Sequence, residues 1–189
     1  ASGAACARLT TGQVRCWGED RPLPMAVSNP SNTGPLTDVT AVAVGDDHAC
    51  ALLGSGQVAC WSGTGSGPEF PTVVSDPSGT GPLSGVTSIA VDSDRTCVGF
   101  AVGTAACWGD PPIGDGTAEA RAVPTIVAGL ETAADVTVGW MHNCVRLTDG
   151  QARCWGFNDH GQVGYGTTGT SYNGFPGPLR PIVVRVPRS

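Results

Sequence analysis

Lysine is absent from this sequence, whose 10 basic residues, all arginine, stand against 16 acidic ones. The formal charge of −6 argues against nucleic acid and anionic membranes as partners, because both are bound by clustered cations. No apolar run approaches the roughly 18 residues of a membrane-spanning helix, and no basic leader precedes a hydrophobic segment. We therefore expect a mature soluble chain or a fragment, without membrane insertion.

Helical periodicity is missing as well. Instead, 28 glycines and 15 prolines interrupt short apolar stretches, and this composition favours strands and turns over helices. We recognise no serine-nucleophile motif, no phosphate-binding glycine loop and no paired carboxylates at a shared site. The sequence therefore predicts an all-β protein that is not an enzyme and requires no cofactor.

Metal ligands are sparse at the spacings that metals require. No two cysteines stand two to four residues apart and no histidine pair has ligand spacing, which argues against zinc. The loops with Asp46 and Asp47 and with Asp92 and Asp94 could hold calcium only weakly, because they lack the ligand number of a dedicated loop. We expect solvated acidic turns there and no metal site.

What the sequence does contain is a fourfold repeat of two cysteines and a tryptophan. It is clearest over residues 144–156, and earlier copies begin at Cys6, Cys50 and Cys97. In each copy nine residues separate the cysteines, a glycine follows the first cysteine by six positions, and a tryptophan follows the second. The period of 44 to 47 residues indicates stacked supersecondary units, such as solenoid turns or propeller blades.

The cysteine spacing fits a β-hairpin with a three-residue loop whose glycine takes the left-handed conformation. The two cysteines then lie directly opposite each other, with Cα atoms about 4.5 Å apart, within the range of a disulfide. This register selects four local pairs among the many that eight cysteines allow. The predicted disulfides are Cys6–Cys16, Cys50–Cys60, Cys97–Cys107 and Cys144–Cys154. The alternative is eight reduced, buried cysteines.

Two further apolar stretches accompany the hairpins. Proline-led outer strands are expected at 24–28, 71–74, 124–127 and 181–186, and inner Val- and Ala-rich strands at 39–44, 86–91 and 136–138. We predict one domain of four-stranded antiparallel blades, with repeats at about 1–38, 39–85, 86–133 and 134–189. The tryptophans of the repeat (Trp17, Trp61, Trp108 and Trp155) are expected to anchor blade packing.

Four hairpins with only three inner strands leave one blade without its inner strand. An unpaired strand edge is a template for association, so we expect oligomerisation or dependence on a longer chain. A second repeat position is polar: His48, Arg95 and His142 each lie two residues before the first cysteine of a hairpin. We expect these residues to hydrogen-bond a neighbouring loop rather than to perform chemistry.

Residues 136–164, which include Cys144, Cys154, Asn158, Gly161 and Gln162, resemble the repeat of the regulator of chromosome condensation family. With its cysteines, the stretch resembles the form of the repeat met in bacterial surface and secreted proteins. The Asn-x-x-Gly-Gln segment is degenerate or missing in the first three repeats. The resemblance implies a β-propeller, usually of seven blades. Four repeats would then form an incomplete or oligomer-completed propeller.

The resemblance also implies a rigid scaffold for protein binding, with nucleotide exchange on a small GTPase in the nuclear branch and β-lactamase inhibition in a bacterial branch. Exchange activity is not expected here, because disulfides argue against cytosol and nucleus. We expect a non-enzymatic, extracellular or cell-surface scaffold that binds a protein partner or further copies of itself. The alternatives are a carbohydrate-binding propeller, since aromatic loop residues suit sugar stacking, and an inhibitor of a secreted enzyme.

Binding is expected to concentrate on the fourth repeat. Trp140 occupies the position of Asp46 and Ser93 in earlier copies, so it lies outside the packing period. Aromatic anchors in adaptable loops on a rigid sheet are typical of binding hot spots. The candidate binding residues are Trp140, Met141, His142, Phe157, Tyr165, Tyr172 and Phe175. The alternative is that Trp140 caps an open propeller end or fills the last blade.

Overall fold

The computed structural model describes residues 3–18, 21–62, 70–169 and 177–185. Every regular element in these residues is a strand, so the all-β prediction is confirmed and none of them forms a membrane-spanning helix. The strands are β1 (Ala5–Arg8), β2 (Val14–Gly18), β3 (Arg21–Ala26), β4 (Val39–Val44), β5 (His48–Leu53), β6 (Val58–Ser62), β7 (Thr72–Val73), β8 (Val86–Asp92), β9 (Arg95–Phe100), β10 (Ala105–Gly109), β11 (Arg121–Ile126), β12 (Ala133–Gly139), β13 (His142–Leu147), β14 (Ala152–Gly156) and β15 (Ile182–Val183).

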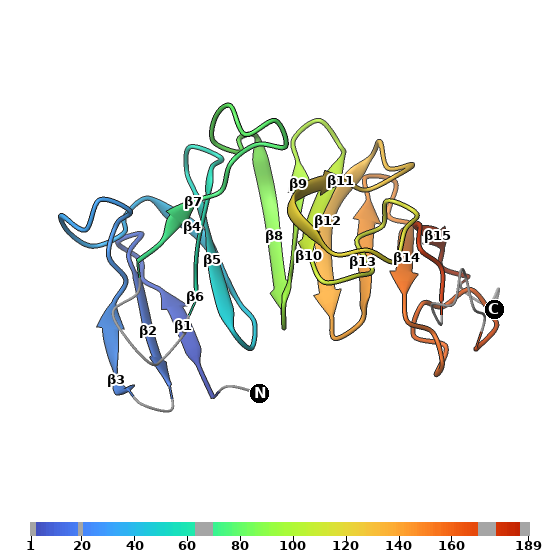
Figure 1. Cartoon of the computed structure of the whole chain (residues 1–189), viewed down its shortest axis with the longest axis horizontal. Helices are drawn as coiled ribbons and strands as arrows, with labels where there is room; N and C mark the ends of the chain where they lie inside the picture. Colours follow the sequence, from blue (N-terminus) through green and yellow to red (C-terminus); the bar gives the residue numbers. More distant parts are fainter. Residues whose placement is uncertain (1–2, 19–20, 63–69, 170–176, 186–189) are drawn as a thin grey trace. The chain divides into compact units, whose positions relative to one another are not determined.

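The strands form four antiparallel sheets in which neighbours in sequence are neighbours in the sheet (Figure 1). Their orders are β1-β2-β3, β4-β5-β6-β7, β11-β10-β9-β8 and β12-β13-β14-β15. The last three have the predicted blade pattern of an inner strand, a cysteine hairpin and an outer strand. The first sheet has three strands, so one blade lacks its inner strand within the described residues, as predicted.

The chain divides into two compact units, Ala1–Asp94 and Arg95–Ser189. The boundary falls at the turn between β8 and β9. The first unit contains the first two sheets, and the second contains the fourth sheet with the cysteine hairpin of the third.

The cysteine hairpins have the predicted geometry. Their glycines, Gly12, Gly56, Gly103 and Gly150, have φ angles of 75°, 76°, 84° and 85°. Each glycine N–H donates to the carbonyl three residues earlier, over 2.8 to 3.0 Å, which closes a three-residue loop. The paired cysteines lie opposite each other in all four hairpins, with Cα atoms 4.1 Å apart. The four predicted disulfides are therefore confirmed.

The prediction that all four repeat tryptophans are core anchors is wrong for two of them. Trp61 and Trp155 are buried, whereas Trp17 and Trp108 are only partly buried. Trp61 packs in a cluster with Val27 and Leu36, which belong to the connection of the preceding repeat. The connection of the preceding repeat thus buries the Trp61 ring.

Candidate functional site

Two of the three polar residues that lie two positions before the first cysteine of a hairpin, His48 and Arg95, make the predicted loop contacts. In the first unit, the His48 imidazole hydrogen-bonds the backbone of Ser93. Burial lowers the pKa of His48, while this hydrogen bond and the nearby Asp94 and Asp47 carboxylates act in the opposite direction. His48 therefore fastens the turn before β5 to the turn after β8, which is a structural role.

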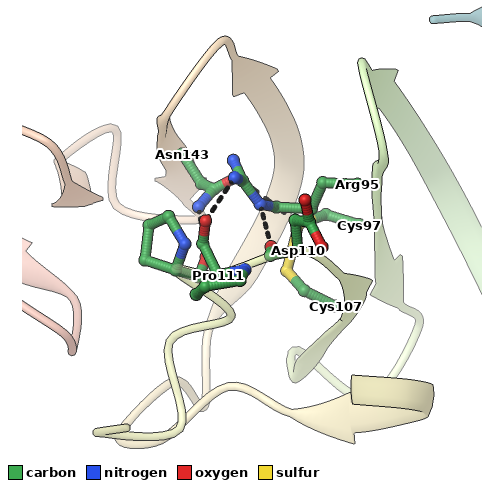
Figure 2. Close-up of a disulfide and its surroundings, with 7 residues drawn as sticks. Arg95, Cys97, Cys107, Asp110, Pro111 and Asn143 are labelled. Atoms are coloured by element: carbon green, nitrogen blue, oxygen red, sulfur yellow. Dashed lines mark hydrogen bonds between the residues drawn. A yellow bond between two sulfur atoms is a disulfide. The ribbon is translucent and has the colours of Figure 1, made fainter. Parts of the chain in front are cut away.

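Arg95 occupies the same repeat position in the second unit, and its guanidinium is buried, with 3% of the residue exposed. Figure 2 shows it between the loop that follows β10 and the side chain of Asn143. Nε donates to the Asp110 carbonyl and Nη2 to the Pro111 carbonyl, both over 2.7 Å. Nη1 lies 3.4 Å from Oδ1 of Asn143. These acceptors compensate for the loss of water around a buried cation.

Asn143 links this network to the fourth sheet. It is fully buried on β13, directly before Cys144, and its Nδ2 donates to the Pro112 carbonyl over 2.9 Å. Sequence reasoning missed Asn143. Its signal was a polar side chain at a position that holds Ala49 in the second repeat. The amide fixes the loop after β10 against the hairpin that carries the aromatic candidates.

The aromatic candidates Trp140 and Phe157 come together at the end of this network. Trp140, in the turn between β12 and β13, is 70% exposed, and Phe157 follows β14. Their rings meet edge to face, with centroids 6.4 Å apart and planes at 63°. The Phe157 N–H donates to the Met141 carbonyl over 2.7 Å, which joins the two segments. We call these two residues the Trp140–Phe157 pair.

Small residues allow this close packing. An ideal Cβ on Gly156 would lie 2.7 Å from the His142 Cα and 2.8 Å from the Pro112 Cγ, so the backbone can approach only with glycine. At Gly139, a Cβ would lie 2.8 Å from the Nε2 atom of His142, whose ring covers that glycine. Met141 and His142 are both partly buried. Met141 and His142 therefore lie next to the aromatic pair, as expected, but of these residues only Trp140 is highly exposed.

The other predicted binding residues belong to the glycine-rich segment after Phe157. Tyr165 is partly buried there, and Tyr172 and Phe175 lie outside the described residues. The start of the segment is organised by Asn158, which is fully buried. Its Nδ2 donates to the Thr167 carbonyl over 2.7 Å, and its Oδ1 accepts the Val163 N–H over 2.9 Å. The asparagine of the sequence motif thus holds the loop that begins beside Phe157.

The described residues were also searched for a metal site and for a cavity. No group of three or more His, Cys, Asp or Glu side chains among them could hold a metal ion. A cavity of about 250 Å³ lies at the opposite end of β12 from Trp140 and is lined by Gly129, Leu130, Glu131, Thr132, Leu147 and Arg153. Arg153 Nη1 donates to the Gly129 carbonyl over 3.0 Å, so the guanidinium forms part of the cavity wall.

Comparison with known proteins identifies the repeat. Residues 39–67 and 133–162 match the family model of the regulator of chromosome condensation (RCC1) repeat. No curated protein matches the sequence. Human WBSCR16 superimposes with a TM-score of 0.78 at 18% identity, covering 98% of this chain and 51% of that chain. Yeast RCC1 (Prp20), in its complex with Kap60, gives 0.69 at 19% identity, covering 99% and 48%.

The computationally designed Ika4 protein is also similar, with a TM-score of 0.53 at 18% identity, covering 82% of this chain and 86% of that chain. The chain spans about half the length of WBSCR16 and Prp20. At these identities the likeness to solved structures shows the fold alone. The repeat match and the sheets agree with the resemblance read from the sequence: residues 39–67 and 133–162 are similar to the regulator of chromosome condensation (RCC1) repeat, and the chain folds into propeller-type β-sheets.

Proposed function

We propose that this chain is a non-enzymatic protein-binding scaffold of the extracellular space or cell surface, which contacts its partner through the Trp140–Phe157 pair. The observation that carries the proposal is the exposure of Trp140. This tryptophan has 70% of its surface in solvent, whereas Trp155 of the same repeat is fully buried. A large exposed aromatic side chain on an ordered turn is typical of binding hot spots.

A disulfide and several buried hydrogen bonds restrain the segments that carry the pair. The Cys144–Cys154 disulfide joins the two strands that lead to Trp140 and Phe157. The Arg95 and Asn143 hydrogen bonds hold the adjacent loop. A preorganised surface loses little conformational entropy on binding, so more of the contact energy appears as affinity.

The four disulfides support an oxidising compartment, and from this we infer secretion or surface display. Yeast Prp20, which shares the fold, is described in complex with Kap60 and as binding Gsp1p and histones. Those partners are proteins, and this supports a protein as the class of partner here. A secreted enzyme that the scaffold inhibits, or a further copy of the chain, would both belong to that class.

A carbohydrate ligand is the second candidate, favoured by one observation. The rings of Trp140 and Phe157 meet edge to face rather than stacking, and the Trp140 ring remains mostly exposed. An exposed indole face is a stacking platform for the apolar face of a sugar ring. The same Trp140 would then carry glycan binding.

The test compares three immobilised versions of the chain: wild type, Trp140→Ala and Val102→Ala. Val102 is a matched control because it is 78% exposed on a different hairpin loop. Each version is incubated with extracellular protein and, separately, with a glycan array, and bound material is quantified. We expect a protein bound by wild type and Val102→Ala but lost with Trp140→Ala. Retention of the same protein by Trp140→Ala would refute the proposal, and selective loss of a glycan would establish the second candidate.

A further inference from the structure

The cavity between the connection that precedes β12 and the β13–β14 hairpin is a second surface with a defined chemistry. Its volume is about 250 Å³, which is below the roughly 300–1,000 Å³ of pockets for drug-sized ligands. At about 30 Å³ for each water molecule, the cavity has room for about eight waters. A ligand with roughly eight or nine non-hydrogen atoms would therefore fill this space.

Arg153 brings a cation to a position that is alanine in the two preceding repeats. The residue before the second cysteine of the hairpin is Ala59 in the second repeat and Ala106 in the third, and both are fully buried. At Arg153, Nη1 donates to the Gly129 carbonyl, whereas Nε is buried without a hydrogen-bond partner in the described part of the chain. A buried donor without an acceptor is costly. A rotation of the terminal dihedral angles would present this N–H to an acceptor in the cavity.

Glu131 brings the opposite charge to the same cavity. Its backbone carbonyl packs against Gly103, and the neighbouring Thr132 carbonyl accepts the Thr148 N–H over 2.8 Å. The group that Glu131 can offer a ligand is therefore its carboxylate. The ion pairs of the described residues do not join this carboxylate to Arg153. The cavity wall thus carries a cation and an anion that are not paired with each other.

Two leucines supply the apolar part of the wall. Leu130 and Leu147 are 4% and 5% exposed. Leu36 and Leu83, which like Leu130 lie three residues before an inner strand, are each 3% exposed. The connection therefore packs before β12 as it does before β4 and β8, and every residue that lines the cavity belongs to the second unit. An aliphatic group in the cavity would contact both lining leucines.

We propose that this cavity binds a free α-amino acid with an aliphatic side chain, for which leucine has the right size. The carboxylate of the ligand would bind Arg153, its ammonium group would lie at the Glu131 carboxylate, and its side chain would pack against Leu130 and Leu147. A zwitterion complements both charges of the wall. A ligand with a carboxylate alone would place like charges together at Glu131, which is unfavourable.

Three compounds test the two ligand charges on the wild-type chain: L-leucine, N-acetyl-L-leucine, which lacks the ammonium group, and L-leucinamide, which lacks the carboxylate. Affinity is measured at neutral pH by titration calorimetry and by the rise of the unfolding midpoint with ligand concentration. We expect saturable binding of L-leucine and a loss of about tenfold or more in affinity for each analogue. Absence of saturable L-leucine binding would overturn the proposal. Equal binding of N-acetyl-L-leucine would overturn it as well, because the site would then recognise a carboxylate alone, such as a peptide C-terminus.

Two variants assign each charge to its residue. Arg153→Ala should weaken L-leucine by about tenfold or more and leave the affinity for L-leucinamide unchanged, and Glu131→Gln should weaken L-leucine but not N-acetyl-L-leucine. Arg146→Ala is the matched control, because Arg146 is exposed and lies on the opposite face of β13 from Leu147. This variant and Trp140→Ala should keep the wild-type affinity. Wild-type affinity for L-leucine in Arg153→Ala or Glu131→Gln would refute the site. If either of these variants does not fold, the analogue series on the wild-type chain still decides.

Discussion

Arg95 and Asn143 are joined across two sheets of the second unit, with Nη1 of the arginine 3.4 Å from Oδ1 of the asparagine. Both residues are buried, and both also bind carbonyls of the loop that follows β10. The cation is thus held by backbone dipoles and one amide. The loop that follows β10 includes Pro112, whose ring packs against Gly156, the residue before Phe157. The hydrogen bonds of Arg95 and Asn143 therefore hold a loop that packs next to the aromatic pair.

Replacing Asn143 by alanine should lower the free energy of unfolding by about 1–3 kcal/mol. The change leaves the Pro112 carbonyl and one guanidinium donor without the amide that now bonds them. Urea denaturation measures the loss. The control is Arg146→Ala on the same strand, which is exposed and should change stability by less than about 0.5 kcal/mol. Equal effects of the two substitutions would show that the network contributes nothing.

Removing the Cys97–Cys107 disulfide, by changing both cysteines to alanine, should cost about 2–3 kcal/mol. The bridge restricts the unfolded chain, and both cysteines are buried, so their removal also loosens packing. Thermal unfolding with and without reductant measures the loss of stability.

The pairing of the cysteines is tested separately, by peptide mapping of the oxidised chain without reductant. Bridges between different repeats, or eight free thiols, would contradict the register seen in all four hairpins.

Stability should fall as the pH drops below the ordinary histidine pKa of 6.5, and His48 should contribute to that fall. Burial lowers the pKa of His48, so the folded chain binds this proton less readily than the unfolded chain. The stability that neutral His48 contributes is fully present above the pKa of this histidine in the unfolded chain. It is lost as the pH falls from that value towards the lower pKa of His48 in the folded chain.

The measurement is the unfolding midpoint between about pH 7.5 and about pH 5, in wild type and His48→Gln. The variant should show a flatter slope over this interval. Identical slopes for wild type and His48→Gln would rule out this origin.

Trp140→Ala should leave the free energy of unfolding within about 0.5 kcal/mol of wild type, since the ring is 70% exposed. Trp155→Ala removes a fully buried ring and should cost about 3–5 kcal/mol. Calorimetry of the two variants separates the binding interpretation of Trp140 from the alternative that it caps or fills a blade. A large loss of stability with Trp140→Ala would favour that alternative.

Gly103→Ala should be more damaging than Gly150→Ala, although the two glycines occupy the same hairpin position with φ of 84° and 85°. Both substitutions incur the strain of an L-residue in the left-handed region. Only at Gly103 would the new Cβ also approach backbone, 2.9 Å from the Glu131 carbonyl carbon, whereas Gly150 has nothing within 4 Å. Chemical denaturation of the two variants measures the difference in their free energies of unfolding. Equal losses would mean that the backbone strain at positive φ accounts for the whole cost of each substitution.

The hairpins, their disulfides and the repeat could be predicted from the amino-acid sequence alone. A hairpin is local: ten positions separate Cys6 from Cys16, and Gly12 supplies the left-handed turn that brings them together. Spacing therefore predicts both the register and the pairing. The three inner strands of the described residues could be counted for the same reason, because each has its own apolar signature.

Which side chains are buried, and which of them contact each other, became clear only from the folded structure. Trp17 and Trp155 have the same place in the repeat but different burial, since burial depends on which side chains and loops from elsewhere in the chain pack over each ring. The Arg95–Asn143 contact joins positions 48 residues apart, and the edge-to-face contact of Trp140 with Phe157 joins two connections of one blade. Such contacts depend on how separate strands and loops pack, and no local spacing in the chain encodes them.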